Sequence, residues 1–269
     1  MQQALMGRMI AAVGLVLGFV AIFVKFASTS GGSAKYSDDG TVLAFLLVAL
    51  ILAAVCLAAT FAGSDNMEAP AAVAGGAAFG FYLFIPSAFG FNHFDIVDTG
   101  GWLGICSGLI PLGLWYSMSS KAATLNRPSP LLAAPAIVGR ICCIVAVWLT
   151  AEIGTSYWNL LDQGRALPAL MLVLVIGGAL LGIATTFGSG STRVTADGAL
   201  IFAAVTFGLY GAEAIQSAFG DFGSLGTGAW LGAAGGLVLL IGVAMLWSHA
   251  TGAAPARRPA QTAVAPPAV

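Results

Sequence analysis

Residues 41–62 read TVLAFLLVALILAAVCLAATFA, a run of 22 residues that contains no charged side chain. A helix of this length crosses about 30 Å, which is the thickness of the hydrocarbon core of a bilayer. Seven more apolar runs of similar length occur, at 9–26, 69–89, 101–118, 137–158, 166–187, 199–219 and 228–248. Because the runs are continuous rather than alternating, they indicate helices and not the strands of a barrel. We therefore expect an all-α membrane protein with about eight transmembrane helices.

The composition also points to lipid as the main solvent. Hydrophobic residues make up 59% of the 269 residues and charged residues only 8%, whereas roughly a quarter of an ordinary soluble domain is charged. Ten Lys and Arg residues provide no basic stripe, which argues against a nucleic-acid partner. The four cysteines lie inside apolar runs without the spacing of metal ligands. We expect no disulfide, no metal site and no cofactor.

Three short motifs occur twice, in the same order. FGFY at 79–82 recurs as FGLY at 207–210, SAFG at 87–90 recurs at 217–220, and GWLG at 101–104 recurs as AWLG at 229–232. This order indicates an internal duplication. Since each copy holds an even number of helices, the two copies should be parallel repeats.

The duplication divides the chain into four parts. We expect one four-helix repeat over 1–119 and a second over 136–250. A cytoplasmic linker at 120–135 joins them, and the Ala/Pro-rich end at 251–269 should form a disordered cytoplasmic tail.

The basic residues predict the orientation. With the N-terminus in the cytoplasm, three of the ten fall outside and seven inside, the latter being Arg8, Lys121, Arg127, Arg140, Arg193, Arg257 and Arg258. This bias favours both termini in the cytoplasm, for a multi-pass protein of the plasma membrane. Tryptophan suits both interfaces as an anchor. The candidates are Trp102, Trp158 and Trp230 at the outer ends, and Trp115 and Trp247 at the inner ends. Trp148 falls in the middle of the fifth predicted helix.

Two carboxylates fall inside predicted helices, Glu152 in the fifth and Glu213 in the seventh. A charge in the membrane is costly, at roughly 2.5–3.5 kcal/mol near the centre, so both are candidates for a proton or cation site. Gln216 lies one turn from Glu213 and can bond a protonated carboxyl. The other interpretation is that both acids lie close to the outer surface, where they reach water or pair with Arg165. The sequence leaves the two interpretations balanced.

Glycines at helical spacing mark two candidate packing seams. Gly104 and Gly108 follow Trp102, and Gly232 and Gly236 occupy the matching places after Trp230. Small residues let transmembrane helices approach closely. Pro86 and Pro111 should interrupt the third and fourth helices, which predicts kinks in the first half only.

Each half opens its last helix with a similar motif, Thr99-Gly100-Gly101-Trp102 in the first and Thr227-Gly228-Ala229-Trp230 in the second. In this motif and in its layout, each half resembles the small four-helix membrane proteins of actinobacterial envelopes, of the mycobacterial 34 kDa antigenic protein type. That group has four spans and a long tail. The resemblance implies a membrane-embedded helical unit and supplies no catalytic residue.

Three functions are compatible with these features. The first is a non-enzymatic structural or accessory component of a membrane or cell-envelope assembly, which packs against other membrane proteins. The second is a small-solute or proton-coupled transporter with a site between the repeats. An enzyme that acts on lipid-linked substrates through His93, Asp95 and Asp98 of an outer loop ranks last, because the first half has no second acidic cluster nearby in sequence.

Overall fold

The computed structural model describes residues 2–29, 32–89, 97–121, 126, 128–152, 155–156, 158–159, 166–187, 193–218 and 226–252. At positions 29, 85–89, 130, 150–152, 155, 213 and 216–218 it describes the backbone alone. The loop residues His93 and Asp95, part of the linker at 120–135 and most of the tail at 251–269 lie outside these ranges.

The first half contains five α-helices and a hairpin among its described residues. The helices are α1 (Gln2–Phe23), α2 (Gly40–Phe61), α3 (Glu68–Phe89), α4 (Thr99–Cys106) and α5 (Leu109–Ser119). Strands β1 (Lys25–Thr29) and β2 (Gly32–Lys35) form an antiparallel hairpin after α1. Two short 3₁₀ turns, η1 (Tyr36–Asp38) and η2 (Asp65–Met67), precede α2 and α3.

Short polar segments end the apolar helices. Asp39 caps α2, because its carboxylate accepts hydrogen bonds from the backbone N–H groups of Thr41 and Val42 and so satisfies donors that have no partner in the first turn. After the last turn of α2 the chain reverses direction at Gly63, whose φ of 98° favours glycine. Asp98 caps α4 in the same way, by accepting from the N–H of Thr99.

The fourth predicted helix, at 101–118, is two helices rather than one. α4 ends at Cys106 and α5 begins at Leu109. Pro111 has no N–H to donate to the carbonyl of Ser107, and the N–H of Ile110 bonds that carbonyl instead at 2.8 Å, so the chain takes a tighter turn. The expected interruption of the fourth helix is therefore present, whereas its counterpart α10 (Thr227–Thr251) is continuous.

The second half repeats the order of elements. After the turn η4 (Pro130–Ala133) come α6 (Ala134–Trp148), the strand pair β3 (Thr150–Glu152) and β4 (Thr155–Ser156), and then α8 (Leu167–Phe187), α9 (Arg193–Ala218) and α10. The predicted fifth helix at 137–158 is too long, because α6 ends at Trp148 and Leu149 is extended. Trp148 is therefore the last residue of its helix and not mid-span. Its ring stacks on Trp158, with centroids 5.7 Å apart.

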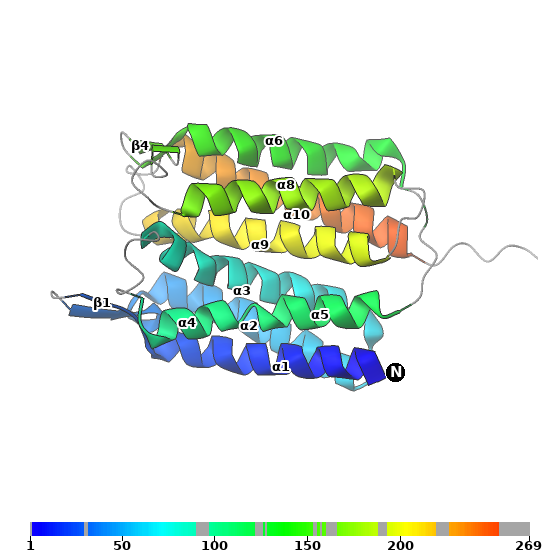
Figure 1. Cartoon of the computed structure of the whole chain (residues 1–269), viewed down its shortest axis with the longest axis horizontal. Coiled ribbons are helices and arrows are strands. Elements are labelled where there is room, and N and C mark those ends of the chain that lie inside the picture. The colour runs from blue at the N-terminus through cyan, green and yellow to red at the C-terminus, as the bar shows by residue number, and fades with distance from the viewer. Residues whose placement is uncertain are drawn as a thin grey trace, which may run out of the picture.

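The helices lie side by side with their long axes aligned, so that the bundle has two ends (Figure 1). We call the end with both strand pairs the hairpin end, and the end where α1 starts and α10 finishes the basic end. Helices α3 and α9 meet where the two halves pack together. A Cβ on Gly76 of α3 would lie 3.0 Å from the Cβ of Ala204 on α9, so small residues bring these two backbones close.

One buried contact occurs in both halves at matching positions. The hydroxyl of Tyr82 on α3 donates to the carbonyl of Gly18 on α1 at 2.8 Å, and the hydroxyl of Tyr210 on α9 donates to the carbonyl of Cys143 on α6, also at 2.8 Å. In each half the third helix is thus fastened to the first through a tyrosine.

Within the described residues, six helices are long and apolar enough to cross a membrane: α1, α2, α6 with its leading turn, α8, α9 and α10. The runs at 69–89 and 101–118 are not among the six; the second is divided between α4 and α5. Of the α9 span 78% is buried, against 33–44% for the other five, so α9 is the most enclosed of them. Large apolar side chains such as Val48, Val173 and Leu180 are 62–68% exposed, as expected for a surface that faces lipid.

Candidate functional site

A network of charges lies at the basic end of the first half, where Glu68 begins α3 with only 1% of its side chain exposed. Its Oε1 accepts a hydrogen bond from Arg8 Nε of α1 and another from the Ser117 hydroxyl of α5, each at 2.8 Å. Its Oε2 lies 2.9 Å from Lys121 Nζ. Two cations and a hydroxyl therefore compensate the buried carboxylate, as a charge removed from water requires.

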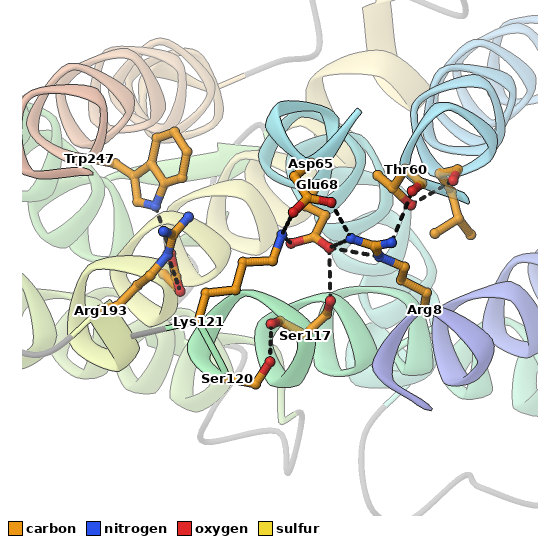
Figure 2. A network of polar contacts seen from close by, with 11 residues as sticks. Arg8, Thr60, Asp65, Glu68, Ser117, Ser120, Lys121, Arg193 and Trp247 are labelled. Atoms are coloured by element: carbon orange, nitrogen blue, oxygen red, sulfur yellow. Dashed lines mark hydrogen bonds and ion pairs between the residues drawn. The ribbon is translucent and has the colours of Figure 1, made fainter. Parts of the chain in front are cut away.

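Asp65 and the end of α2 complete this network (Figure 2). Asp65 Oδ1 lies 2.6 Å from Arg8 Nη2, and its Oδ2 lies 3.0 Å from Lys121 Nζ. Arg8 also donates to the carbonyl of Thr60 at 2.9 Å. Hydrogen bonds from Lys121 and then from Arg8 lower the pKa of Asp65 below its ordinary value of 3.8. The network therefore joins α1, α2, α3 and α5 at the basic end.

A smaller network lies at the basic end of the second half. Asp197 on α9 is fully buried, and its Oδ1 accepts a hydrogen bond from the indole N–H of Trp247 on α10 at 2.7 Å. Its Oδ2 has no hydrogen-bond partner, and Arg193 Nε lies 3.6 Å away. Glu68 Oε2 also lacks a hydrogen-bond partner, but the cations paired with Glu68 lie at 2.7 and 2.9 Å, whereas the one paired with Asp197 lies at 3.6 Å. Asp197 is therefore the less completely compensated of the two carboxylates.

The two networks are neighbours across the contact between α5 and α9. Figure 2 shows Arg193 and Trp247 beside Lys121, which reaches toward Asp65 and Glu68. The indole N–H of Trp115 on α5 donates to the carbonyl of Val194 on α9 at 3.1 Å. The basic end therefore carries polar contacts both within each half and between the halves.

The acids singled out from the sequence lie elsewhere. Glu152 is in strand β3 at the hairpin end and not inside a helix, because α6 ends four residues before it. Glu213 and Gln216 are in α9, as the sequence predicts. The side chains of all three lie outside the described part of the chain, so the site that the sequence predicts from them stays a prediction. Asp98, from the outer loop, accepts a hydrogen bond from the Ser28 hydroxyl at 2.7 Å and fastens the hairpin to α4.

The glycines of the two candidate seams lie against aromatic residues. A Cβ on Gly104 would lie 2.6 Å from the ring of Tyr82, and one on Gly108 would lie 2.8 Å from the ring of Phe79. In the second half, Gly232 faces the ring of Tyr210, and Gly236 faces the backbone of Phe207. Since larger side chains would crowd these groups, α4 and the turn after it pack directly on α3, and α10 packs directly on α9.

The tryptophans fall into two groups. Trp102, Trp158 and Trp230 at the hairpin end are 39–47% exposed, so part of each side chain lies at the surface, as for an interfacial anchor. Trp115 and Trp247 at the basic end are partly buried and donate their N–H groups to Val194 and Asp197. These two therefore also act as contacts inside the protein.

No protein-family model, no curated protein and no solved structure matches this chain. The resemblance to the actinobacterial envelope proteins accordingly stays a prediction, and the function is argued from the chain itself.

Sequence reasoning missed the charged groups at the basic end, although a signal was present. Glu68 and Asp197 are 129 residues apart, one more than the offset of 128 between the FGFY and FGLY motifs. Each stands just before a predicted apolar run, on the side where Arg8, Lys121 and Arg193 were predicted. An acid that occurs in both halves at nearly the repeat offset, on the side predicted to carry most of the cations, could have indicated a pair of ion-pair networks.

Proposed function

We propose that this chain is a multi-pass plasma-membrane protein that acts as a non-enzymatic structural or accessory component of a membrane or cell-envelope assembly. It crosses the bilayer eight times, as two parallel four-helix repeats with both termini in the cytoplasm. Its partners are the lipid bilayer and other membrane proteins.

Eight spans are supported by the helices that lie beside the six candidates. α3 has 22 residues, as many as α1 and α2. α4 and α5 continue one another along the bundle (Figure 1). Parallel repeats are supported by the matching tyrosine contacts and by the hairpin that follows the first helix of each half. The cytoplasmic placement of the termini is supported by Arg8, Lys121 and Arg193, which gather at the end where α1 begins and α10 finishes.

The observation that carries the accessory function is the closed seam between the halves. Gly80 of α3 faces the backbone of Val205, and Gly208 of α9 faces the backbone of Ala77. A transporter of this architecture needs a site between its repeats, whereas here backbone packs on backbone. In the second half, the gap lined by Gly182, Thr185 and Trp247 has about 10 Å³ of room, enough for one water at most. Within the described residues, this close packing between the halves and the broad apolar exterior suit a protein that works through its outer faces.

Native assembly tests this function directly. Membranes of the source cell are extracted into polymer nanodiscs without detergent, and the mass of the particles is measured by light scattering. We expect the 27.1 kDa chain within a larger complex that holds another membrane protein at fixed stoichiometry. Particles that always hold one lone copy would overturn the proposal.

Topology is tested separately by single cysteines in a variant that lacks the four native ones. We expect cysteines at Ser120 and Ser248, at the basic end, to react with an impermeant maleimide only from the cytoplasmic side. A cysteine at Ser33 in the β1–β2 hairpin is the matched control and should react only from outside. Labelling of Ser120 and Ser248 from opposite sides would refute the parallel arrangement.

Proton-coupled transport is the second candidate, and Asp197 is the observation that favours it. This carboxylate is fully buried, its Oδ2 lacks a hydrogen bond and the cation paired with it lies 3.6 Å away, so it is a group able to take up a proton. Proton flux into proteoliposomes loaded with a pH-sensitive dye tests this role, with Asp197→Asn compared with Glu213→Gln. Flux that Asp197→Asn abolishes would favour transport. Wild-type vesicles as tight as empty ones would eliminate it.

A further inference from the structure

Arg140, the seventh residue of α6, takes no part in the two networks at the basic end. Its Nη2 donates to the carbonyl of Gly178 on α8 at 2.9 Å. A Cβ on Gly182 of α8 would lie 2.6 Å from the same nitrogen. The two glycines, one turn apart, therefore make the space in which the guanidinium lies between α6 and α8.

This position is inside the apolar layer. α8 has 21 residues, which at 1.5 Å per residue gives about 30 Å, the thickness of the hydrocarbon. Gly182 and Gly178 lie about 7 Å and 14 Å from its last residue, Phe187, by the same rise per residue. The guanidinium is thus well below the membrane surface, where a charge is costly and marks a functional group by default.

Within the described part of the chain, the charge of Arg140 is not neutralised. The ion pairs of this part join Asp65, Glu68 and Asp197 to Arg8, Lys121 and Arg193. Arg140 takes part in none of them. Its Nε is buried without a hydrogen-bond partner. One carbonyl that is already part of a helix is a weak partner for a buried cation.

The fold itself does not require a cation here. Gly139 faces the backbone of Leu239 on α10, and Gly14 of α1 faces the backbone of Ile110 on α5, so the two glycines occupy corresponding places. The residue after Gly14 is Leu15. The first half thus forms the corresponding close contact between its first and last helices, although it has Leu15 at the position that Arg140 occupies in the second half.

Arg140 lies at the edge of the α6–α8 face, with its inner side against a gap that Phe202 of α9 and Leu239 of α10 also line. Arg140 is partly exposed, and large apolar side chains flank it on both helices. Ile137 and Ile141 of α6 are 50% and 55% exposed, and Leu180 and Ile183 of α8 are 63% and 55% exposed. The α6–α8 face is therefore apolar, and Arg140 is the one charged residue in the two helices.

We infer that this α6–α8 face binds a transmembrane helix of another membrane protein, and that a carboxylate at the matching depth of that helix pairs with Arg140. The inference rests on the proposed accessory function and names the chemistry of its partner. Charge complementarity selects the carboxylate, because an apolar helix alone would leave the guanidinium uncompensated. A lipid phosphate is the weaker candidate, because headgroups lie outside the hydrocarbon and Arg140 is held below its edge.

Synthetic helices test this pairing. The probe is a Leu/Ala transmembrane peptide with one Asp seven residues from its end and a dansyl label, and the controls carry Asn or Leu at that place. Binding in phosphatidylcholine vesicles is followed by energy transfer from the tryptophans of the protein. We expect the Asp peptide to bind the wild type at least tenfold more tightly than the Leu peptide.

Variants of Arg140 assign the effect. Arg140→Leu, which introduces the side chain that Leu15 has in the first half, should bind the Asp and Leu peptides alike, and Arg140→Lys should keep part of the preference. Thermal unfolding of Arg140→Leu should match or exceed the wild type, which separates binding from folding. Equal binding of the Asp, Asn and Leu peptides by the wild type would overturn the inference. An Arg140-dependent preference for phosphatidylglycerol, without any peptide preference, would assign the site to lipid and overturn it too.

The native complex distinguishes the two failures. A complex that survives Arg140→Leu, together with no peptide preference, removes this inference and leaves the accessory function standing. A lone wild-type monomer in native membranes removes the accessory function whatever the peptides do.

Discussion

The Arg8 guanidinium holds the Glu68 carboxylate through two contacts to one oxygen, Nε to Oε1 at 2.8 Å and Nη2 to Oε1 at 2.7 Å. This pair joins the start of α1 to the start of α3. Its members are 60 positions apart in the chain, and its acid is buried. Removing one member of a buried ion pair lowers the stability of a protein strongly, because the other charge then stays buried without compensation.

Glu68→Gln should destabilise the protein by about 3 kcal/mol, because Arg8 and Lys121 would lose their shared buried counter-charge. Asp65→Asn is the matched control, and it should cost about 1 kcal/mol or less, since Asp65 is exposed. Unfolding in SDS, followed by tryptophan fluorescence, measures both. Equal losses for the two variants would contradict a special role for the buried acid.

The pH dependence of stability should include a contribution from Asp65. Its pKa is lowered in the folded protein by Lys121 and Arg8, so the folded state binds the proton less readily than the unfolded state. The stabilisation is present above the ordinary pKa of 3.8 and is lost as the pH falls through the lower folded value. We expect the free energy of unfolding of the wild type to decrease in that acidic range. The Asp65→Asn variant should lack this contribution to the decrease. Parallel curves would show that Asp65 contributes nothing.

Gly104→Ala should destabilise the first half, because the new Cβ would lie 2.6 Å from the ring of Tyr82 and one helix would have to move. Overpacking of this kind costs about 1–3 kcal/mol. Gly211→Ala is the control within α9, where a Cβ would meet nothing within 4 Å. This control should be neutral or up to about 1 kcal/mol stabilising, through helix propensity. The thermal unfolding midpoint of each variant is the measurement, and a neutral Gly104→Ala would argue against the tight contact.

Tyr82→Phe and Tyr210→Phe should weaken the protein by similar amounts. Each removes one buried hydrogen bond of 2.8 Å to a backbone carbonyl, which contributes about 0.5–1.5 kcal/mol. Hydrogen exchange should then rise in α1 for the first variant and in α6 for the second. A large effect from only one of them would mean that the two halves do not share this contact.

Long apolar runs in the sequence predicted the positions of the helices most reliably. The runs at 41–62 and 166–187 became α2 and α8 almost residue for residue, because burial and lipid act on them in the same direction. The end of α6 was missed, since Leu149 and Ala151 continue the apolar pattern although the chain turns into strand β3. Hydropathy cannot distinguish a helix from an extended strand over so few residues.

The candidate site was harder to predict for a related reason. Glu152 was placed in a helix only because the predicted helix was too long. Glu68 and Asp197 stood just outside the predicted spans and were therefore not weighed as membrane acids. Their burial depends on α1, α5 and α10 packing over them, and such long-range contacts leave little trace in local composition.

The contact between Trp115 and Val194 has a consequence for biosynthesis. Once the chain has grown to residue 121, it contains Arg8, Glu68 and Lys121. The first half can therefore complete its ion pairs while translation of the second half continues. The indole N–H of Trp115 must wait for a carbonyl 79 positions further on, which at about 5–20 residues per second is a delay of roughly 4–16 seconds. During that interval the nascent first half exposes the glycine-lined face of α3 to the insertion machinery, and arrested chains of this length are the place to look for a chaperone.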